Sequence, residues 1–145
     1  MTDRYAEYRA VAKSQGVDAL ALVPGPNFVR LMGQDFGSHE RPLVLVIPAD
    51  GKPAAIVPNL ELSSFDMLNF EGEVFDWRDQ DGYQNAFEAL ARHMPLDSLV
   101  VEGQIMRVFV HHALLAARPG LRIVDGERPD LGIAAAQDRG RNPDT

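Results

Sequence analysis

The chain of 145 residues contains no cysteine. This absence excludes disulfide bonds, thiolate metal sites and a cysteine nucleophile. The motifs of several common sites are also missing, among them Gly-x-Gly-x-x-Gly after a strand, the phosphate loop Gly-x-x-x-x-Gly-Lys, the zinc helix His-Glu-x-x-His and the nucleophile turn Gly-x-Ser-x-Gly. The residues alone therefore point to no catalytic site of these types.

Long apolar runs and an excess of positive charge are absent too. The longest apolar run, 43–47, is far too short to span a bilayer, and residues 1–5 lack the pattern of a signal peptide. The formal net charge of −7 disfavours binding to nucleic acid or to an anionic membrane surface. We expect a cytoplasmic protein with neither of these partners.

The residues that are present alternate between helical and strand patterns. Hydrophobic residues make up 46% of the chain, a value typical of one globular domain. Apolar spacing predicts helices over 5–12, 28–32, 59–68, 83–94 and 105–117, and strands over 17–23, 42–47, 54–57, 74–77, 99–101 and 122–124. This order predicts an α/β fold in which helices cover both faces of a mixed sheet.

Short-range signals predict where several elements begin and end. Asp3 and Asn27 are candidate helix caps, and Gly16 and Gly33 suit the positions just past two helices. An Asp-Gly pair within 49–52 predicts a hairpin between the second and third strands. In the helix over 105–117, we expect the apolar face to include Val108, Phe109, Leu115 and Ala116.

The histidines and acidic clusters give little evidence of chemistry. His111 and His112 are neighbours on a predicted helix, so their side chains diverge by about 100° and do not suit one metal ion. The acids of 76–81 lack the glycine and the distal glutamate of a calcium loop, which favours a solvated loop. His39 lies in the polar loop 34–41, where a functional and a purely structural role both stay open.

The order of several short motifs resembles the N-terminal domain of the creatinase/prolidase/aminopeptidase P family of metallopeptidases. The matching segments are GVDAL at 16–20, PNFVRLMG at 26–33, ERP at 40–42, GKP at 51–53, VPNLE at 57–61, VEG at 101–103 and MR at 106–107. The resemblance covers about residues 5–125. One position departs from the family pattern, because Arg30 stands where the family usually has an aromatic residue.

The resemblance implies a three-layer sandwich with a mixed six-stranded sheet, helices on both faces and a ribonuclease H-like motif. In the family, this domain packs against a catalytic domain of the same or a related chain, contributes to a homodimer and lends a loop that closes the active site of the partner subunit. The catalytic domain holds two divalent metals (Mn, Co or Zn) that activate water. This chain has no segment that resembles the catalytic domain, so we expect no cofactor in it.

The loop 34–41 corresponds by position to the substrate-facing loop of the family. Arg41 is the first candidate for substrate binding, since a guanidinium can hold a carboxylate through two hydrogen bonds. His39 and Phe36 are further candidates in the same loop. The alternative for Arg41 is that it merely precedes a strand and lies in water.

The resemblance ends near residue 125, and this sets the expected domain boundary. We expect one domain over residues 1–125 and a weakly structured tail over 126–145, where Leu131 and Ile133 are the only bulky apolar residues. The linker helix of the family does not follow, which suggests a shifted reading frame or a premature end. The leading interpretation is a non-catalytic domain of an X-Pro dipeptidase-like enzyme. A stand-alone dimerisation module and a small-molecule-binding domain are the alternatives.

Overall fold

The computed structural model describes residues 3–36 and 41–126. Six strands form one mixed sheet in the order β4-β3-β2-β1-β5-β6. β1 is antiparallel to β2 and β2 to β3, whereas β3–β4, β1–β5 and β5–β6 are parallel pairs. The strands are β1 (Ala19–Leu22), β2 (Val44–Pro48), β3 (Ala54–Pro58), β4 (Glu73–Trp77), β5 (Ser98–Val101) and β6 (Arg122–Asp125). The predicted mixed six-stranded sheet is confirmed.

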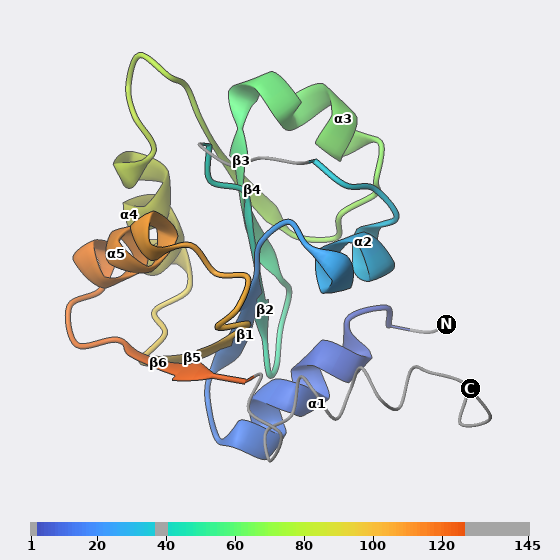
Figure 1. Cartoon of the computed structure of the whole chain (residues 1–145), viewed down its shortest axis with the longest axis vertical. Coiled ribbons are helices and arrows are strands. Elements are labelled where there is room, and N and C mark those ends of the chain that lie inside the picture. Colours follow the sequence, from blue (N-terminus) through green and yellow to red (C-terminus); the bar gives the residue numbers. More distant parts are fainter. Residues whose placement is uncertain (1–2, 37–40, 127–145) are drawn as a thin grey trace.

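Helices cover both faces of this sheet, as the sequence predicted (Figure 1). One face carries α1 (Ala6–Gln15), α2 (Pro26–Met32) and α3 (Leu62–Asp66), which follows a short 3-10 turn over Asn59–Glu61. The other face carries α4 (Gln84–His93) and α5 (Val108–Ala117). None of the helices in the described segments is both long and apolar enough to cross a membrane.

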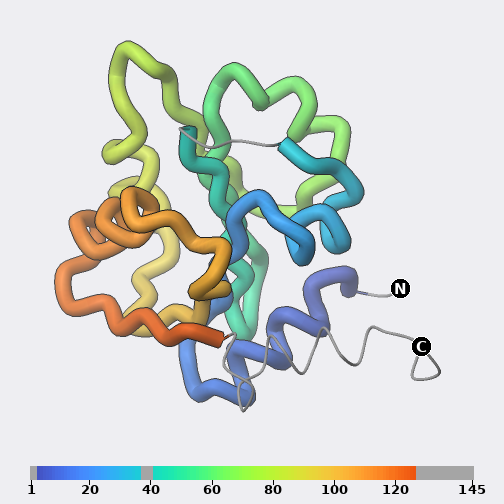
Figure 2. Tube along the Cα trace, in the orientation of Figure 1, coloured from blue at the N-terminus to red at the C-terminus, as the bar shows by residue number. Residues whose placement is uncertain are grey.

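The alternation of side chains along β1 explains how one strand serves two cores. Leu20 and Leu22 join the core under α1 and α2, while Ala19 and Ala21 join the core under α4 and α5. All residues of β1, β2, β3 and β5 are buried, which agrees with their nearly continuous apolar sequences. The edge strands β4 and β6 are partly exposed. In Figure 2, the early and late segments of the chain meet at the centre of the sheet, where β1 pairs with β5.

The glycine signals for element ends are confirmed. Gly16 and Gly33 follow α1 and α2 with φ angles of 66° and 83°, a left-handed conformation that suits glycine. Asp3, by contrast, is not the N-cap of α1, because Tyr5 occupies that position; the Asp3 carboxylate accepts a hydrogen bond from the Tyr5 backbone N–H at 2.9 Å. The hairpin at Gly51 joins β2 to the antiparallel β3.

Two further local predictions were wrong. Asn27 does not cap α2, because Gly25 precedes this helix and Pro26 begins it. The last helix begins at Val108 rather than at 105, since the residues before it form a turn in which the Ile105 N–H donates to the Glu102 carbonyl at 3.0 Å.

The apolar face predicted for α5 was right in part: Phe109 and Leu115 pack against the core under α4 and α5, whereas Val108 and Ala116 are exposed. Its buried residues are Val110, Ala113 and Leu114, whereas Val108 is 69% exposed. The sequence of α5 (VFVHHALLAA) is apolar around most of its circumference. Periodicity therefore could not indicate which side packs on the sheet.

Candidate functional site

A crevice lies at the carboxyl ends of β1 and β5, which are adjacent and parallel. From β1 the chain continues into α2 on one face of the sheet, and from β5 it continues into α5 on the other face (Figure 1). Such a reversal of direction is where open α/β sheets usually bind ligands. The crevice has a volume of about 340 Å³, and we call it the switch-point crevice; it is lined by residues 23–25, 35, 41–43, 104–105, 107 and 109–110.

Arg41 is the residue of this crevice with the best-defined geometry. Its Nε donates to Asp79 Oδ1 at 2.9 Å, and its Nη2 donates to Asp79 Oδ2 at 2.7 Å. These hydrogen bonds lower the pKa of the Asp79 carboxyl below its ordinary value of 3.8. Both side chains are exposed, with relative exposures of 43% and 52%. The guanidinium is therefore already arranged to bind a carboxylate in a two-pronged pair at the protein surface.

Guanidinium groups outnumber carboxylates among the lining residues of the crevice, and one of them, Arg41, is already paired with Asp79. Arg41 and Arg107 contribute two guanidinium groups to its lining, and Asp35 contributes one carboxylate. Arg107 directly precedes α5, so the partly positive N-terminus of this helix adds to the same potential. This arrangement can bind a carboxylate, but it brings together no nucleophile and base.

A buried polar contact lies behind the crevice. The side chains of Asn27 and Glu102 are each only 2% exposed, and Asn27 Nδ2 donates to Glu102 Oε2 at 2.9 Å. The Tyr8 hydroxyl donates to Asn27 Oδ1 at 3.3 Å, and burial raises the pKa of Tyr8 above its ordinary value of 10.0. These contacts join α1, the start of α2 and the end of β5. They hold the two segments that diverge at the crevice.

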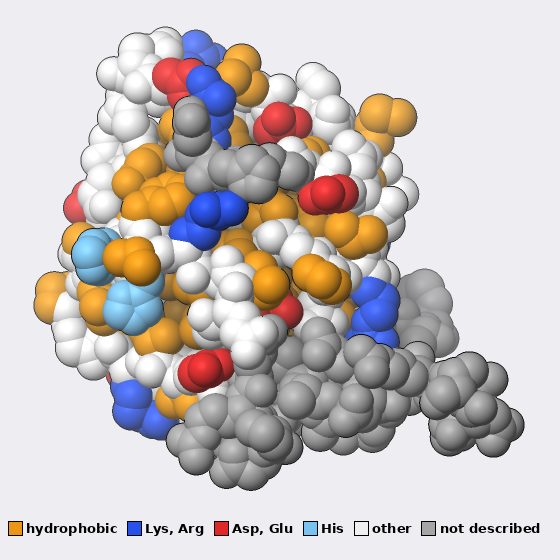
Figure 3. Space-filling view, viewed as in Figure 1, with side chains coloured by type: hydrophobic (Ala, Val, Ile, Leu, Met, Phe, Trp, Pro, Cys, Tyr) orange, Lys and Arg blue, Asp and Glu red, His pale blue; other side chains and the backbone are white. Residues whose placement is uncertain are grey.

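The described residues contain no metal site. No group of three histidine, aspartate or glutamate side chains within 3–36 and 41–126 is close enough to hold an ion. The rings of His111 and His112 are 6.2 Å apart on α5, and Figure 3 shows histidine side chains beside apolar ones over this helix. This part of the chain therefore offers no set of ligands for the two divalent metals that the sequence resemblance implies for a catalytic domain.

Comparison with known proteins identifies the chain's family. The family profile described as "Creatinase/Prolidase N-terminal domain" matches residues 4–129. The chain belongs to the creatinase/prolidase N-terminal domain family. The curated protein "Probable dipeptidase PepE" of Mycobacterium tuberculosis is 29% identical over 102 residues, which cover 68% of this chain and 27% of the relative. The chain therefore spans about a quarter of the length of the curated relatives that it matches.

Solved structures show the same creatinase/prolidase N-terminal fold. The N-terminal domain of an X-Pro dipeptidase from Streptococcus pyogenes superposes with a TM-score of 0.76 at 18% identity, over 95% of this chain and 98% of that one. Dipeptidase PepE from Mycobacterium ulcerans superposes with a TM-score of 0.69 at 27% identity, over 83% of this chain and 33% of that one. The recognition of the family from its short motifs is confirmed.

The structure separates the three predicted substrate-binding residues of this creatinase/prolidase N-terminal domain. Arg41 lines the switch-point crevice. Phe36 instead packs beside the core, with its ring 5.8 Å from that of Phe28 and 6.2 Å from that of Phe65. His39 lies outside the described residues. Substrate binding by these residues stays a prediction.

Sequence reasoning missed Asn27 and Glu102 as partners. Both lie in family motifs, the PNF and VEG segments, yet they are 75 positions apart in the chain. The sequence did contain one signal of this contact, because each motif places a polar residue among apolar ones.

The structure also gives Arg30, the departure from the family pattern, a local role. Its Nη2 lies 2.6 Å from Glu7 Oε2 and donates to the Tyr8 hydroxyl at 3.4 Å, so Arg30 links α2 to α1. The hydrogen bond to Glu7, followed by that to Tyr8, raises the pKa of Arg30 above its ordinary value.

Proposed function

We propose that this chain serves as the non-catalytic N-terminal domain of an X-Pro dipeptidase-like or aminopeptidase P-like hydrolase, to which it contributes dimer contacts and a substrate-capping loop. Membership of the creatinase/prolidase N-terminal domain family is the observation that carries the proposal. The two-pronged pairing of Arg41 with a carboxylate at the edge of the switch-point crevice supports the capping role.

In this proposal, Arg41 recognises the C-terminal carboxylate of a dipeptide. The substrate carboxylate replaces Asp79 as the acceptor of both guanidinium hydrogen bonds, so the geometry of the pair is retained. Exchange is feasible because both side chains are exposed, and exposed ion pairs are weak. A separate catalytic domain supplies the chemistry, and two divalent metals there (Mn, Co or Zn) activate the water that attacks the peptide bond.

A chimaera tests the capping role. Residues 1–125 of this chain replace the corresponding domain of mycobacterial PepE, and the hydrolysis of Ala-Pro is compared with that of Ala-prolinamide, which has no carboxylate. We expect Arg41→Gln to raise KM for Ala-Pro about tenfold, since a hydrogen bond to a charged group contributes about 1.5–3 kcal/mol. KM for Ala-prolinamide should stay unchanged.

The matched control is Arg122→Gln on the exposed edge strand β6. Equal KM values for the Arg41→Gln and Arg122→Gln chimaeras would show that Arg41 does not contact the substrate. The chain by itself, with Mn²⁺, should release no proline from Ala-Pro above the blank. Measurable release would contradict a non-catalytic role.

Size determination by light scattering at micromolar concentration tests the dimer. A homodimer has twice the chain mass of 16.0 kDa, and closed two-fold dimers are the commonest oligomers. A monomer at all concentrations would contradict this part of the proposal.

The switch-point crevice favours one alternative, a stand-alone small-molecule-binding domain. Its two arginines and its position at the carboxyl ends of parallel strands are typical of a site for an anionic metabolite. An inactive chimaera, together with a rise in the melting temperature of the chain in the presence of acidic or prolyl ligands, would favour this alternative.

A further inference from the structure

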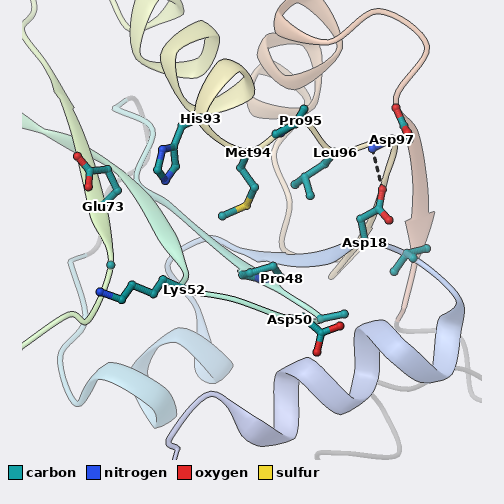
Figure 4. Close-up of a pocket in the computed structure, with 13 residues that line it drawn as sticks. Asp18, Pro48, Asp50, Lys52, Glu73, His93, Met94, Pro95, Leu96 and Asp97 are labelled. Atoms are coloured by element: carbon teal, nitrogen blue, oxygen red, sulfur yellow. Dashed lines mark hydrogen bonds between the residues drawn. The ribbon is translucent and has the colours of Figure 1, made fainter.

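A second depression lies at the opposite end of the sheet from the switch-point crevice. It has a volume of about 720 Å³, within the usual range for small-molecule sites. Four segments form it: residues 17–18 before β1, residues 48–52 at the hairpin, residues 72–73 at the start of β4, and residues 93–97 between α4 and β5. We call it the hairpin groove (Figure 4).

Most acidic side chains of the hairpin groove already have partners within the protein. Asp18 Oδ2 accepts a hydrogen bond from the Asp97 backbone N–H at 2.8 Å. The Asp97 carboxylate lies 2.7 Å from Arg118 Nη2, and Asp50 Oδ1 lies 3.5 Å from Lys13 Nζ. In Figure 4, these three acids lie towards one end of the groove. Asp18 thus fixes the backbone at Asp97, and the Asp97 and Asp50 carboxylates each lie beside a cation of the protein.

Three ionisable side chains towards the other end have no such partner. Within residues 3–36 and 41–126, Lys52, Glu73 and His93 make no ion pair and no side-chain hydrogen bond. The ring of His93 packs against Phe75 at 5.5 Å. Figure 4 shows the three side chains on the same side of the groove, from the hairpin, β4 and α4. One cation and one anion are therefore available to a ligand in the same depression.

The backbone keeps Lys52 and Glu73 in a defined relation. The Glu73 N–H donates to the carbonyl of Pro53, the neighbour of Lys52, at 3.3 Å. Gly72 permits this approach, because a Cβ atom there would lie 1.8 Å from the Pro53 oxygen. The spacing of the two charged residues is thus set by paired backbone rather than by a flexible loop.

Between the two ends, the groove is apolar. Pro48, Met94 and Leu96 line this middle part (Figure 4), and Met94 and Leu96 are only half-buried, so part of their apolar surface faces solvent. α4 ends at His93, which lines the same groove as Glu73, so the partly negative C-terminus of the helix adds to the attraction for a cation there.

We propose that the hairpin groove binds a free amino acid with an apolar side chain. The ligand carboxylate pairs with Lys52, its ammonium pairs with Glu73 beside the C-terminus of α4, and its side chain covers Met94 and Leu96. This site is separate from the capping role of Arg41 and does not depend on it. A zwitterion satisfies both opposite charges and the apolar strip, whereas a ligand with one charge leaves one group solvated.

Backbone amide NMR of the whole chain at pH 7 tests the proposal with three matched probes. L-norleucine carries both charges and a linear apolar chain; hexanoate lacks the ammonium, and pentylamine lacks the carboxylate. We expect norleucine to shift the amide resonances of Lys52, Glu73, His93, Met94 and Leu96 in a saturable way. Hexanoate and pentylamine should each bind at least fivefold more weakly. Resonances around the switch-point crevice should not move.

Variants assign the contacts. Lys52→Ala and Glu73→Ala should each weaken norleucine binding at least fivefold, and both positions are exposed, so the fold is retained. The controls are Arg92→Ala and Asp66→Ala, exposed positions outside the groove whose loss should leave binding unchanged. The proposal is overturned if norleucine gives no saturable shift up to about 20 mM, if either single-charge probe binds as tightly, or if the groove variants behave like the controls.

Discussion

Single polar side chains link segments that lie far apart in this sequence. Asn27 is the main example, because its amide joins the start of α2 to the buried Glu102 at the end of β5. A buried carboxylate depends strongly on its donors, since removal of one donor leaves charge in a site that excludes water. The Asn27 amide therefore contributes more to stability than a surface amide does.

We expect Asn27→Ala to lower the free energy of unfolding by about 1.5–3 kcal/mol, the range for a hydrogen bond to a charged group. Asn85→Ala on the exposed side of α4 is the control and should change it by less than about 0.5 kcal/mol. Urea denaturation followed by circular dichroism measures both. Similar decreases in the free energy of unfolding for the two variants would show that the contact with Glu102 does not stabilise the fold more than a surface amide does.

The Arg41–Asp79 pair should make the stability of the fold depend on pH through the Asp79 carboxyl. Because Arg41 lowers the pKa of Asp79 in the folded state, the pair stabilises the fold fully above the ordinary pKa of 3.8. This stabilisation is lost as the pH falls through the lower folded-state pKa. In Arg41→Gln, we expect the pKa of Asp79 to return towards 3.8, measured by carbon NMR of the carboxyl during an acid titration. An unchanged pKa would indicate that the pair does not persist in solution.

At the scale of elements, α4 and α5 show two ways in which a helix finds its buried side. In α4, apolar residues recur on one side and polar residues occupy the other, so Ala86, Phe87 and Leu90 are buried as a stripe. In α5, apolar residues surround the helix, and contact with α4 and the sheet selects the buried side. The buried side of α4 therefore follows from the spacing of its apolar residues, whereas the buried side of α5 is set by the elements packed against it.

Because of this difference, we expect two substitutions by alanine, one in each helix, to lower the free energy of unfolding by unequal amounts. Phe87 is 1% exposed, so Phe87→Ala should lower the free energy of unfolding by about 3–5 kcal/mol. Val108→Ala, at a position that is 69% exposed, should change it by less than about 0.5 kcal/mol. The midpoints of urea denaturation give both values. A large loss for Val108→Ala would mean that this side chain is covered in solution.

At the scale of the whole molecule, the two cores share one sheet. β1, β2 and β5 contribute side chains to both cores, so loss of packing in either core uncovers one face of the shared strands. Trp77, the only tryptophan, belongs to the core under α4 and α5 and donates from Nε1 to the Pro42 carbonyl at 3.1 Å. Its fluorescence therefore reports on one core, while circular dichroism reports on all the helices.

We expect these two signals to change together in a single transition. The same midpoint should be found for a chain that ends at residue 126, because Gly126 donates the last backbone hydrogen bond in the described segments, to Val101 at 2.8 Å. Two separate midpoints would contradict a single domain. A lower midpoint for the shorter chain would contradict the predicted domain boundary near residue 125.

The sequence by itself determined the elements and the family of this protein. Continuous apolar runs such as 44–47 predict buried strands, and glycines such as Gly16 and Gly51 mark turns, because these preferences are local to a few residues. The order of the short motifs was enough to identify the family. The position of the loop made Arg41 a candidate, although it did not reveal Asp79 as its partner.

Only the tertiary structure decided which distant residues meet. The pairing of Asn27 with Glu102, the buried side of α5 and the arrangement of Lys52 and Glu73 around one groove all join segments separated along the chain. The order of strands in the sheet brings these segments together, and local periodicity carries no information about that order. The switch-point crevice exists for the same reason, since β1 and β5 become neighbours only when the sheet is assembled.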